Sequence, residues 1–188
     1  MRAVIALGAM ICLCWGVIGS SAQTIEERAA TCTACHGGNG LPKNPQIPII
    51  WGQQSGYLYI QLRDFKLGTR QSAIMQPVVA GLEKSDMQSI AEFFAKKPWP
   101  PTEYKPAEAD NEIGEQISET GMCAECHLDG FVGDGTMPRL AGQMMPYLEK
   151  TMLDFKTGAR ANNPDKSTLL ASYGDDELAA MARYLAGQ

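Results

Sequence analysis

Histidine is almost absent from this sequence of 188 residues, which contains only two. Histidine is the side chain that most often exchanges protons in enzymes, so this scarcity weighs against acid–base catalysis. Basic residues are in the minority as well, with 16 Lys and Arg against 21 Asp and Glu, a formal net charge of −5. The charge argues against a nucleic-acid-binding surface. We therefore expect no nucleic-acid partner, and we expect any electrostatic partner to be a basic protein.

Long apolar runs are also lacking, apart from residues 3–18. That run is shorter than the roughly 20 residues that span a bilayer. It follows Arg2 and precedes the small residues Ser20, Ser21 and Ala22, an order typical of a cleavable export signal. We predict a signal peptide over residues 1–22 and a soluble mature chain that begins at Gln23 in the periplasm. Membrane contact would then come only through a partner or an uncleaved signal.

Four of the six cysteines lie outside this signal, and both histidines follow them directly. The segments Cys-Thr-Ala-Cys-His and Cys-Ala-Glu-Cys-His show the CxxCH pattern of covalent c-type heme attachment. Cysteines three positions apart lie on one helical turn, where both can reach vinyl groups of one porphyrin while the next histidine points at the iron. The sequence predicts two covalent c-type hemes, attached through Cys32, Cys35, Cys123 and Cys126, with His36 and His127 as iron ligands.

Three other interpretations of the cysteine pairs fit less well. Zinc sites built from two CxxC pairs usually place the pairs about 15–20 residues apart, and the separation here is far larger. Thioredoxin-like pairs lie in a βαβ setting, whereas both motifs here run into glycine-containing loops at Gly37 and Gly130. Structural disulfides suit an exported protein but do not explain why every histidine follows a cysteine pair.

The second half of the chain repeats the first at a shift of about 90 residues. Residues 48–70 match residues 138–160 without a gap. Identical pairs are Pro48/Pro138, Gly52/Gly142, Gln53/Gln143, Tyr57/Tyr147, Leu58/Leu148, Asp64/Asp154, Phe65/Phe155, Lys66/Lys156, Gly68/Gly158 and Arg70/Arg160. The repeat predicts two domains, residues 23–97 and 111–188. The linker, residues 98–110, is rich in proline, which opposes helix formation.

Apolar spacing favours helices in both halves, because residues such as Met87, Ile90 and Phe94 recur at intervals of three and four. We predict an all-α fold with three helices in each half. One helix enters each heme motif; the others cover residues 57–67 and 85–96 in the first half, and residues 147–157 and 175–186 in the second.

The sixth iron ligand of an electron-transfer heme is commonly methionine, which raises the reduction potential. Met75 follows the Gly68-Thr69-Arg70 segment by a short loop and precedes Pro77, so we assign it to the first heme and place it outside the helices. Met87 lies on the apolar face of a predicted helix and is better explained as packing.

The second half has Lys166 in place of Met75, and residues 161–168 contain no methionine. Four outcomes remain for the second iron: ligation by Lys166, an open or water-bound site, a displaced methionine, or another residue. Ligation by Lys166 requires a neutral amine. Without thioether sulfur, this heme is expected to have the lower reduction potential.

Other repeated residues have candidate supporting roles. A backbone carbonyl near Pro48 or Pro138 would orient the histidine by accepting its Nδ1 proton, unless these prolines only end an irregular loop. Arginine and tyrosine side chains would bind heme propionates, or else form surface ion pairs and ordinary core packing. The residues concerned are Arg70, Arg160, Tyr57 and Tyr147.

With its two CxxCH motifs, Pro-x-[Ile/Leu]-x-Gly-Gln, Tyr-Leu, Asp-Phe-Lys-x-Gly-x-Arg and a downstream methionine, the chain resembles the two-domain diheme cytochromes of the cytochrome c4 type. It is similar also to the diheme subunit of flavocytochrome c sulfide dehydrogenase. The resemblance implies two tandem class I cytochrome c domains related by pseudo-twofold symmetry. It also implies single-electron transfer with redox partners such as a dehydrogenase or terminal oxidase, as a shuttle or as a subunit of a complex. Lys166 departs from that family, which has methionine in both halves.

We therefore expect an electron-transfer protein and not an enzyme. The alternative is a small heme enzyme with an open or exchangeable site at the second iron, although no spare histidine could serve it as acid or base. A gas or redox sensor would need an output module, and the sequence shows none.

Overall fold

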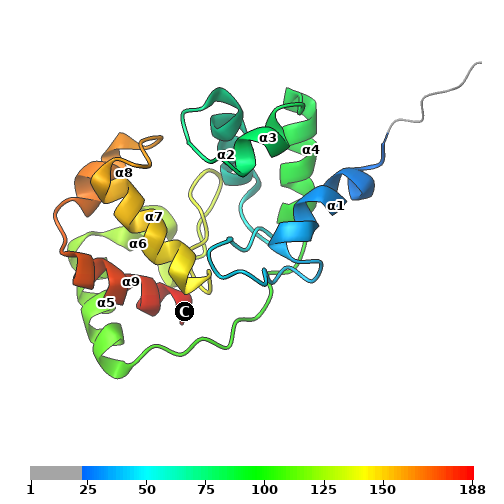
Figure 1. The fold of residues 1–188 in the computed structure, drawn as a ribbon. Helices are drawn as coiled ribbons and strands as arrows, with labels where there is room; N and C mark the ends of the chain where they lie inside the picture. Colours follow the sequence, from blue (N-terminus) through cyan, green and yellow to red (C-terminus); the bar gives the residue numbers. More distant parts are fainter. Residues whose placement is uncertain (1–22) are drawn as a thin grey trace, which may run out of the picture.

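The computed structural model describes residues 23–188, so the predicted signal peptide lies outside the described residues. Figure 1 shows two groups of helices joined by an extended segment. The first group contains α1 (Ile25–His36), α2 (Ser55–Leu67), α3 (Met75–Val79) and α4 (Lys84–Ala95). The second contains α5 (Glu108–Thr120), α6 (Cys123–His127), a 3-10 turn η1 (Asp129–Phe131), α7 (Met145–Thr157), α8 (Pro164–Leu170) and α9 (Asp175–Ala186).

The predicted all-α fold is confirmed, since residues 23–188 contain helices and no strand. The long helices of each half lie where apolar spacing placed them, although α2 and α7 begin slightly earlier than predicted, at Ser55 and Met145. The short helices α3 and α8 were not predicted, and they contain Met75 and Lys166. The placement of Met75 outside the helices was therefore wrong, since it is the first residue of α3.

The helix that enters the second heme motif is interrupted, whereas α1 runs unbroken through the first motif to His36. Helix α5 ends at Thr120, and α6 begins at Cys123. Between them Met122 adopts a left-handed backbone conformation with φ of 50°, which a helix cannot accommodate. The repeat in sequence thus produces the same order of elements with a different approach to the second motif.

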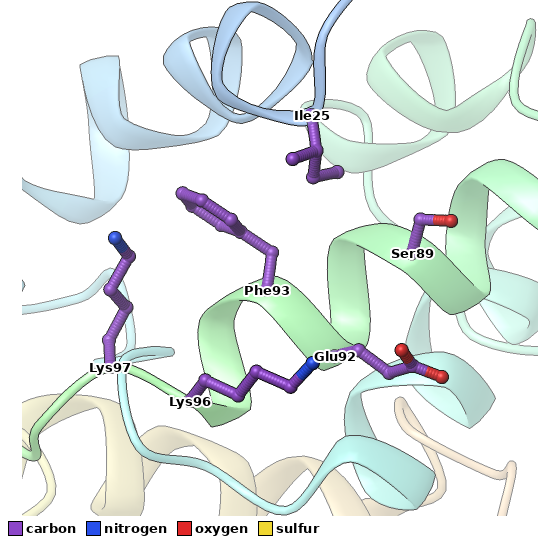
Figure 2. A pocket seen from close by; sticks show the side chains of 6 residues that line it. All are labelled: Ile25, Ser89, Glu92, Phe93, Lys96 and Lys97. Atoms are coloured by element: carbon purple, nitrogen blue, oxygen red, sulfur yellow. The ribbon is translucent and has the colours of Figure 1, made fainter.

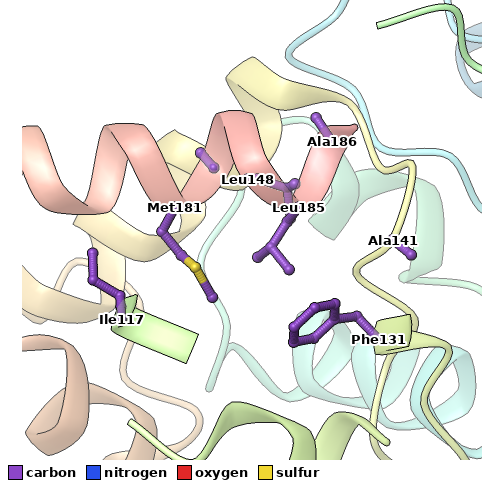
Figure 3. Packing of buried hydrophobic residues seen from close by; sticks show 8 residues of the cluster. Ile117, Phe131, Ala141, Leu148, Met181, Leu185 and Ala186 are labelled. Atoms are coloured by element: carbon purple, nitrogen blue, oxygen red, sulfur yellow. The ribbon is translucent and has the colours of Figure 1, made fainter. Parts of the chain in front are cut away.

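Each half has its own hydrophobic core. In the first half α1, α2 and α4 meet around Ala29, Leu58, Ile90, Ala91 and Phe94. In the second half the residues in Figure 3 form one cluster, to which α5, η1, the loop before α7, α7 itself and α9 contribute. Burying one such leucine or phenylalanine side chain stabilises a fold by about 1.5–3 kcal/mol. Two separate cores are what two tandem domains require.

The two domains differ in how their first and last helices meet. In the second domain Gly114 of α5 lies so close to Tyr184 of α9 that a Cβ built on the glycine would be 2.2 Å from the tyrosine Cβ. In the first domain the α4 residue Phe93 lies instead in a depression of about 380 Å³ that reaches Ile25 at the start of α1 (Figure 2). The depression is lined by none of the residues assigned to heme binding.

The segment between the helix groups is extended from Pro98 to Ala107, as its prolines predict. Trp99 anchors it, because the backbone of Trp99 lies against Gly52 and the guanidinium of Arg139 lies 4.7 Å from the centre of its ring. Helix α5 begins at Glu108, inside the predicted linker, and the division at residues 97 and 111 stays a prediction. Within residues 23–188 no helix is long and apolar enough to span a membrane.

Candidate heme sites

The first candidate site is built at the carboxyl end of α1. Thr24 caps this helix: its side chain accepts from the backbone of Glu27, and the Glu27 carboxylate accepts from the backbone of Thr24. The helix then presents Cys32 half-buried, Cys35 exposed and His36 buried at its last position. One helical turn therefore carries all three groups of the motif on the same segment.

A glycine must follow His36. Gly37 has φ of +89°, and a Cβ at this position would lie 2.2 Å from the carbonyl oxygen of Leu41. The chain turns back at this point, which leads it toward Pro48. The second site makes its turn with Leu128, whose φ is 63° and which is held in this unfavourable conformation by the surrounding chain.

Both histidines donate a hydrogen bond to a proline carbonyl. His36 Nδ1 lies 2.8 Å from the carbonyl oxygen of Pro48, and His127 Nδ1 lies 2.9 Å from that of Pro138. Because the carbonyl can only accept, Nδ1 carries the proton and Nε2 keeps its lone pair. This is the tautomer that an iron ligand needs, and the hydrogen bonds predicted for the two proline loops are confirmed.

Burial keeps both imidazoles neutral. It lowers the pKa of His36 and of His127 below the usual value, although the bonds to Pro48 and Pro138 oppose the change. The positive charge of Lys166 contributes to the lowered pKa of His127. A neutral imidazole binds a metal, whereas a protonated one does not.

The four cysteines of the described chain form no disulfide with one another. Burial raises the pKa of Cys32 and of Cys123, so these thiols stay protonated. Cys35 and Cys126 are exposed. All four sulfur atoms are thus free for thioether bonds, as covalent heme attachment requires.

A partly buried polar cluster connects the two domains. Arg70 donates to the hydroxyl of Tyr147 at 3.2 Å, and Arg160 donates to that of Tyr57 at 3.5 Å. Both guanidinium groups also donate to Gln61 Oε1, at 2.7 and 2.8 Å. Arg160 is only 7% exposed, which excludes the surface ion pair considered for it.

The two arginines of this cluster lack a direct anionic partner. No carboxylate of residues 23–188 forms an ion pair with Arg70 or Arg160. Burial by itself would raise the pKa of Tyr147, but the two guanidinium groups lower it to about 7. Anionic propionates would complete such a set of donors, so the residues fit heme.

The two predicted sixth ligands, Met75 and Lys166, lie in the short helices α3 and α8. Met75 is half-buried, and its backbone donates to Ser72 Oγ at 3.1 Å. Lys166 lies half-buried in α8 and not in a loop. Its charge contributes to the lowered pKa of His127 and opposes the rise that burial causes in the pKa of Cys123. It therefore lies near the second heme motif.

Sequence reasoning did not anticipate Gln61 or Asn162, whose Nδ2 donates to Asp64 Oδ2 across the interface at 2.8 Å. Gln61 corresponds in the repeat to Thr151, so no identity drew attention to it. Gln53 and Gln143 did stand out in the sequence, because they are identical residues at one position of the repeat, but the repeat does not indicate what they bind.

Comparison with known proteins agrees with this geometry. The family model for cytochrome C oxidase, cbb3-type, subunit III matches residues 109–185. A cytochrome c4 of Pseudomonas aeruginosa is 31% identical over 172 residues, covering 86% of each chain. The chain belongs to the cytochrome c4 family. It is accordingly an electron-transfer cytochrome with two covalently bound c-type hemes.

Two further similarities extend the cytochrome c4 relationship. The structure of the Acidithiobacillus ferrooxidans cytochrome c4 superposes with a TM-score of 0.78 and 26% identity, covering 85% of this chain and 99% of that one. It supports the tandem class I cytochrome c domains expected from the repeat. A protein of Thiomonas intermedia, "thiosulfate dehydrogenase electron acceptor", is 33% identical over 201 residues, covering 100% of this chain and 92% of the relative.

Proposed function

We propose that this cytochrome accepts single electrons from a dehydrogenase in the periplasm and passes them to a respiratory acceptor. The observation that carries the proposal is the full-length similarity to the thiosulfate dehydrogenase electron acceptor of Thiomonas intermedia. The export signal predicted over residues 1–22 supports the location. The net charge of −5 supports a basic docking face on at least one partner.

The first heme, in this proposal, is held by Cys32, Cys35 and His36, with Met75 as the sixth ligand. Each heme supplies one reversible electron step between ferric and ferrous iron. The protein orients the imidazole through Pro48 and excludes water by burying His36. Thioether sulfur at the sixth position favours ferrous iron, so the first site is the one of higher reduction potential.

The second heme is held by Cys123, Cys126 and His127, with Lys166 as the sixth ligand. The support for Lys166 is that its charge acts on both His127 and Cys123. An amine gives less preference for ferrous iron than a thioether does, so the second site has the lower potential. We expect the donor to meet the second domain and the acceptor the first, because electrons move toward higher potential.

The test mixes the purified diheme protein with a thiosulfate dehydrogenase and thiosulfate, and follows heme reduction by stopped-flow absorbance. We expect reduction that depends on both enzyme and thiosulfate, with electrons entering at the second heme and collecting first on the first heme, because the first heme has the higher potential. A mixture without thiosulfate is the control. Reduction no faster than in that control would reject this donor.

Cell fractionation checks the location, and recovery in the cytoplasmic fraction would contradict it.

Carbon monoxide binding separates electron transfer from substrate chemistry at the second iron. We expect the reduced protein to bind no carbon monoxide, since both irons carry two protein ligands. Rapid binding at one heme per chain would favour the small heme enzyme instead.

A further inference from the structure

Two glutamines reach across the domain interface with matching hydrogen bonds. Gln143 of the second domain binds both backbone groups of Ile49 in the first: Ile49 N–H donates to Oε1 at 2.7 Å, and Nε2 donates to the Ile49 carbonyl at 3.0 Å. Gln53 of the first domain binds Arg139 of the second in the same way, at 2.8 and 2.9 Å. The pair follows the pseudo-twofold relation between the domains.

These amides are held rigidly. Gln53 is 3% exposed and Gln143 4%, and each Oε1 also accepts from the backbone N–H of the next residue at 2.9 Å. Because Oε1 of each glutamine accepts from two N–H groups, the positions of the amide oxygen and the amide nitrogen cannot be exchanged. Leaving such buried groups without a partner is unfavourable, so both side chains keep one orientation.

The hydrogen bonds of each glutamine lead directly to the histidine of the other domain. The Ile49 N–H and the Pro48 carbonyl belong to one planar peptide group. Gln143 accepts from the N–H of that group, and the carbonyl accepts from His36 Nδ1 at 2.8 Å. In the opposite direction, Gln53 accepts from the N–H of the peptide group whose carbonyl accepts from His127.

We propose that Gln143 and Gln53 are positioning residues, each of which tunes the reduction potential of the heme carried by the other domain. The proposal rests on the assignment of His36 and His127 as iron ligands. A peptide N–H that donates a hydrogen bond makes its own carbonyl a stronger acceptor, because peptide resonance and hydrogen bonding polarise the group together. A stronger acceptor makes the imidazole more basic, which favours ferric iron and lowers the potential.

The test replaces Gln143 with methionine, which keeps a similar volume while removing both polar groups. In Gln143→Met we expect the heme attached at Cys32 and Cys35 to favour ferrous iron by roughly tenfold, the lower end of the effects known for groups that orient metal ligands. The heme of the second domain should change less. Gln53→Met should give the reverse pattern. Redox titration followed by NMR separates the hemes, each assigned by contacts with residues of its own domain.

Gln54→Ala is the matched control. Gln54 lies beside Gln53 and also crosses the interface, donating to the carbonyls of Val132 and Gly133 at 3.1 and 3.0 Å. It does not touch the peptide group that holds His127. We expect Gln54→Ala to leave both potentials close to those of the unmodified protein.

A second readout is independent of any partner: the NMR signal of the histidine Nδ1 proton in the reduced protein. It should move for His36 in Gln143→Met and for His127 in Gln53→Met. Equal shifts of both hemes, a shift confined to the heme of the mutated domain, or unchanged potentials would each overturn the proposal. Failure of the thiosulfate dehydrogenase assay would leave these potentials unaffected, so the two ideas fail separately.

Discussion

Arg70 of the first domain donates a hydrogen bond to the hydroxyl of Tyr147 in the second, at 3.2 Å, in a partly buried cluster. Among residues 23–188 no carboxylate forms an ion pair with this arginine. The neighbouring Arg160 makes the corresponding contact with Tyr57 in the opposite direction. Two positive charges at the domain interface, that of the buried Arg160 and that of the half-buried Arg70, oppose any further gain of positive charge nearby. They therefore favour ferrous iron over ferric iron.

Replacing Arg70 by glutamine tests this electrostatic effect. We expect Arg70→Gln to lower the heme potentials by on the order of 59 mV, a tenfold change in a one-electron equilibrium. Arg63→Gln is the control, because Arg63 is largely exposed and pairs with the adjacent Asp64. Spectroelectrochemical titration measures both variants. A higher potential in Arg70→Gln would show that its charge does not act on the hemes.

Met75→Ala tests the sixth ligand of the first heme. We expect loss of the ferric absorption band specific to methionine ligation, a lower potential, and new carbon monoxide binding after reduction. Met87→Leu serves as the comparison, because Met87 is a buried core residue, 5% exposed, and leucine conserves its volume. If Met75→Ala kept its methionine band, another methionine would have to be the ligand.

Lys166→Met tests the second heme. We expect methionine at this position to raise the potential of the second heme by at least about tenfold in its equilibrium constant, or ~59 mV. EPR of the ferric protein should also change, because an amine ligand is replaced. Lys150→Met, on the exposed surface of α7 in the same domain, should leave the spectra as they are. Unchanged spectra in Lys166→Met would remove lysine as a ligand.

Gly114→Ala tests the close packing of α5 on α9. Alanine is favoured over glycine within a helix by about 1 kcal/mol. Here, however, its Cβ would lie 2.2 Å from Tyr184, and such overpacking costs about 1–3 kcal/mol. We expect net destabilisation, seen as a lower Tm. Gly38→Ala, with no atom within 4 Å of the added Cβ, should leave Tm nearly unchanged. A higher Tm for Gly114→Ala would contradict the packing.

Asp86 links α1 to α4 through its pair with Arg28, and its ionisation should make the stability of the first domain depend on acidic pH. Its carboxylate accepts from the backbone N–H of Glu83 at 2.9 Å and pairs with Arg28. These contacts lower the pKa of Asp86 below its ordinary 3.8, so the stability they contribute is present above 3.8 and is lost as the pH falls through the lowered pKa.

Asp86→Asn should therefore reduce Tm at neutral pH, and the difference from the unmodified protein should shrink at an acidic pH, as the carboxylate of the latter becomes protonated. Thermal unfolding followed by circular dichroism at the two pH values measures this. Asp176→Asn, at an exposed position of α9, is the control. An equal difference at both pH values would exclude the ionised carboxylate as the cause.

The sequence by itself determined the chemistry and the plan of this protein. The CxxCH motifs are local, since Cys32, Cys35 and His36 lie within one helical turn. The repeat and the spacing of apolar residues likewise depend on near neighbours along the chain, so they are sufficient to predict an all-α fold with two domains. The short helix α3 escaped this reasoning because it has only five residues, too few for a periodic pattern.

Only the tertiary structure decided how one domain acts on the other. Gln143 binds Ile49, and Arg160 binds Gln61, across separations of 94 and 99 residues. Nothing in the local sequence encodes such pairs, because each depends on how two separately folded cores are placed against each other. The same holds for Lys166. The repeat showed that a lysine stands where the first half has Met75, but only the packing of α8 brings this lysine near His127 and Cys123.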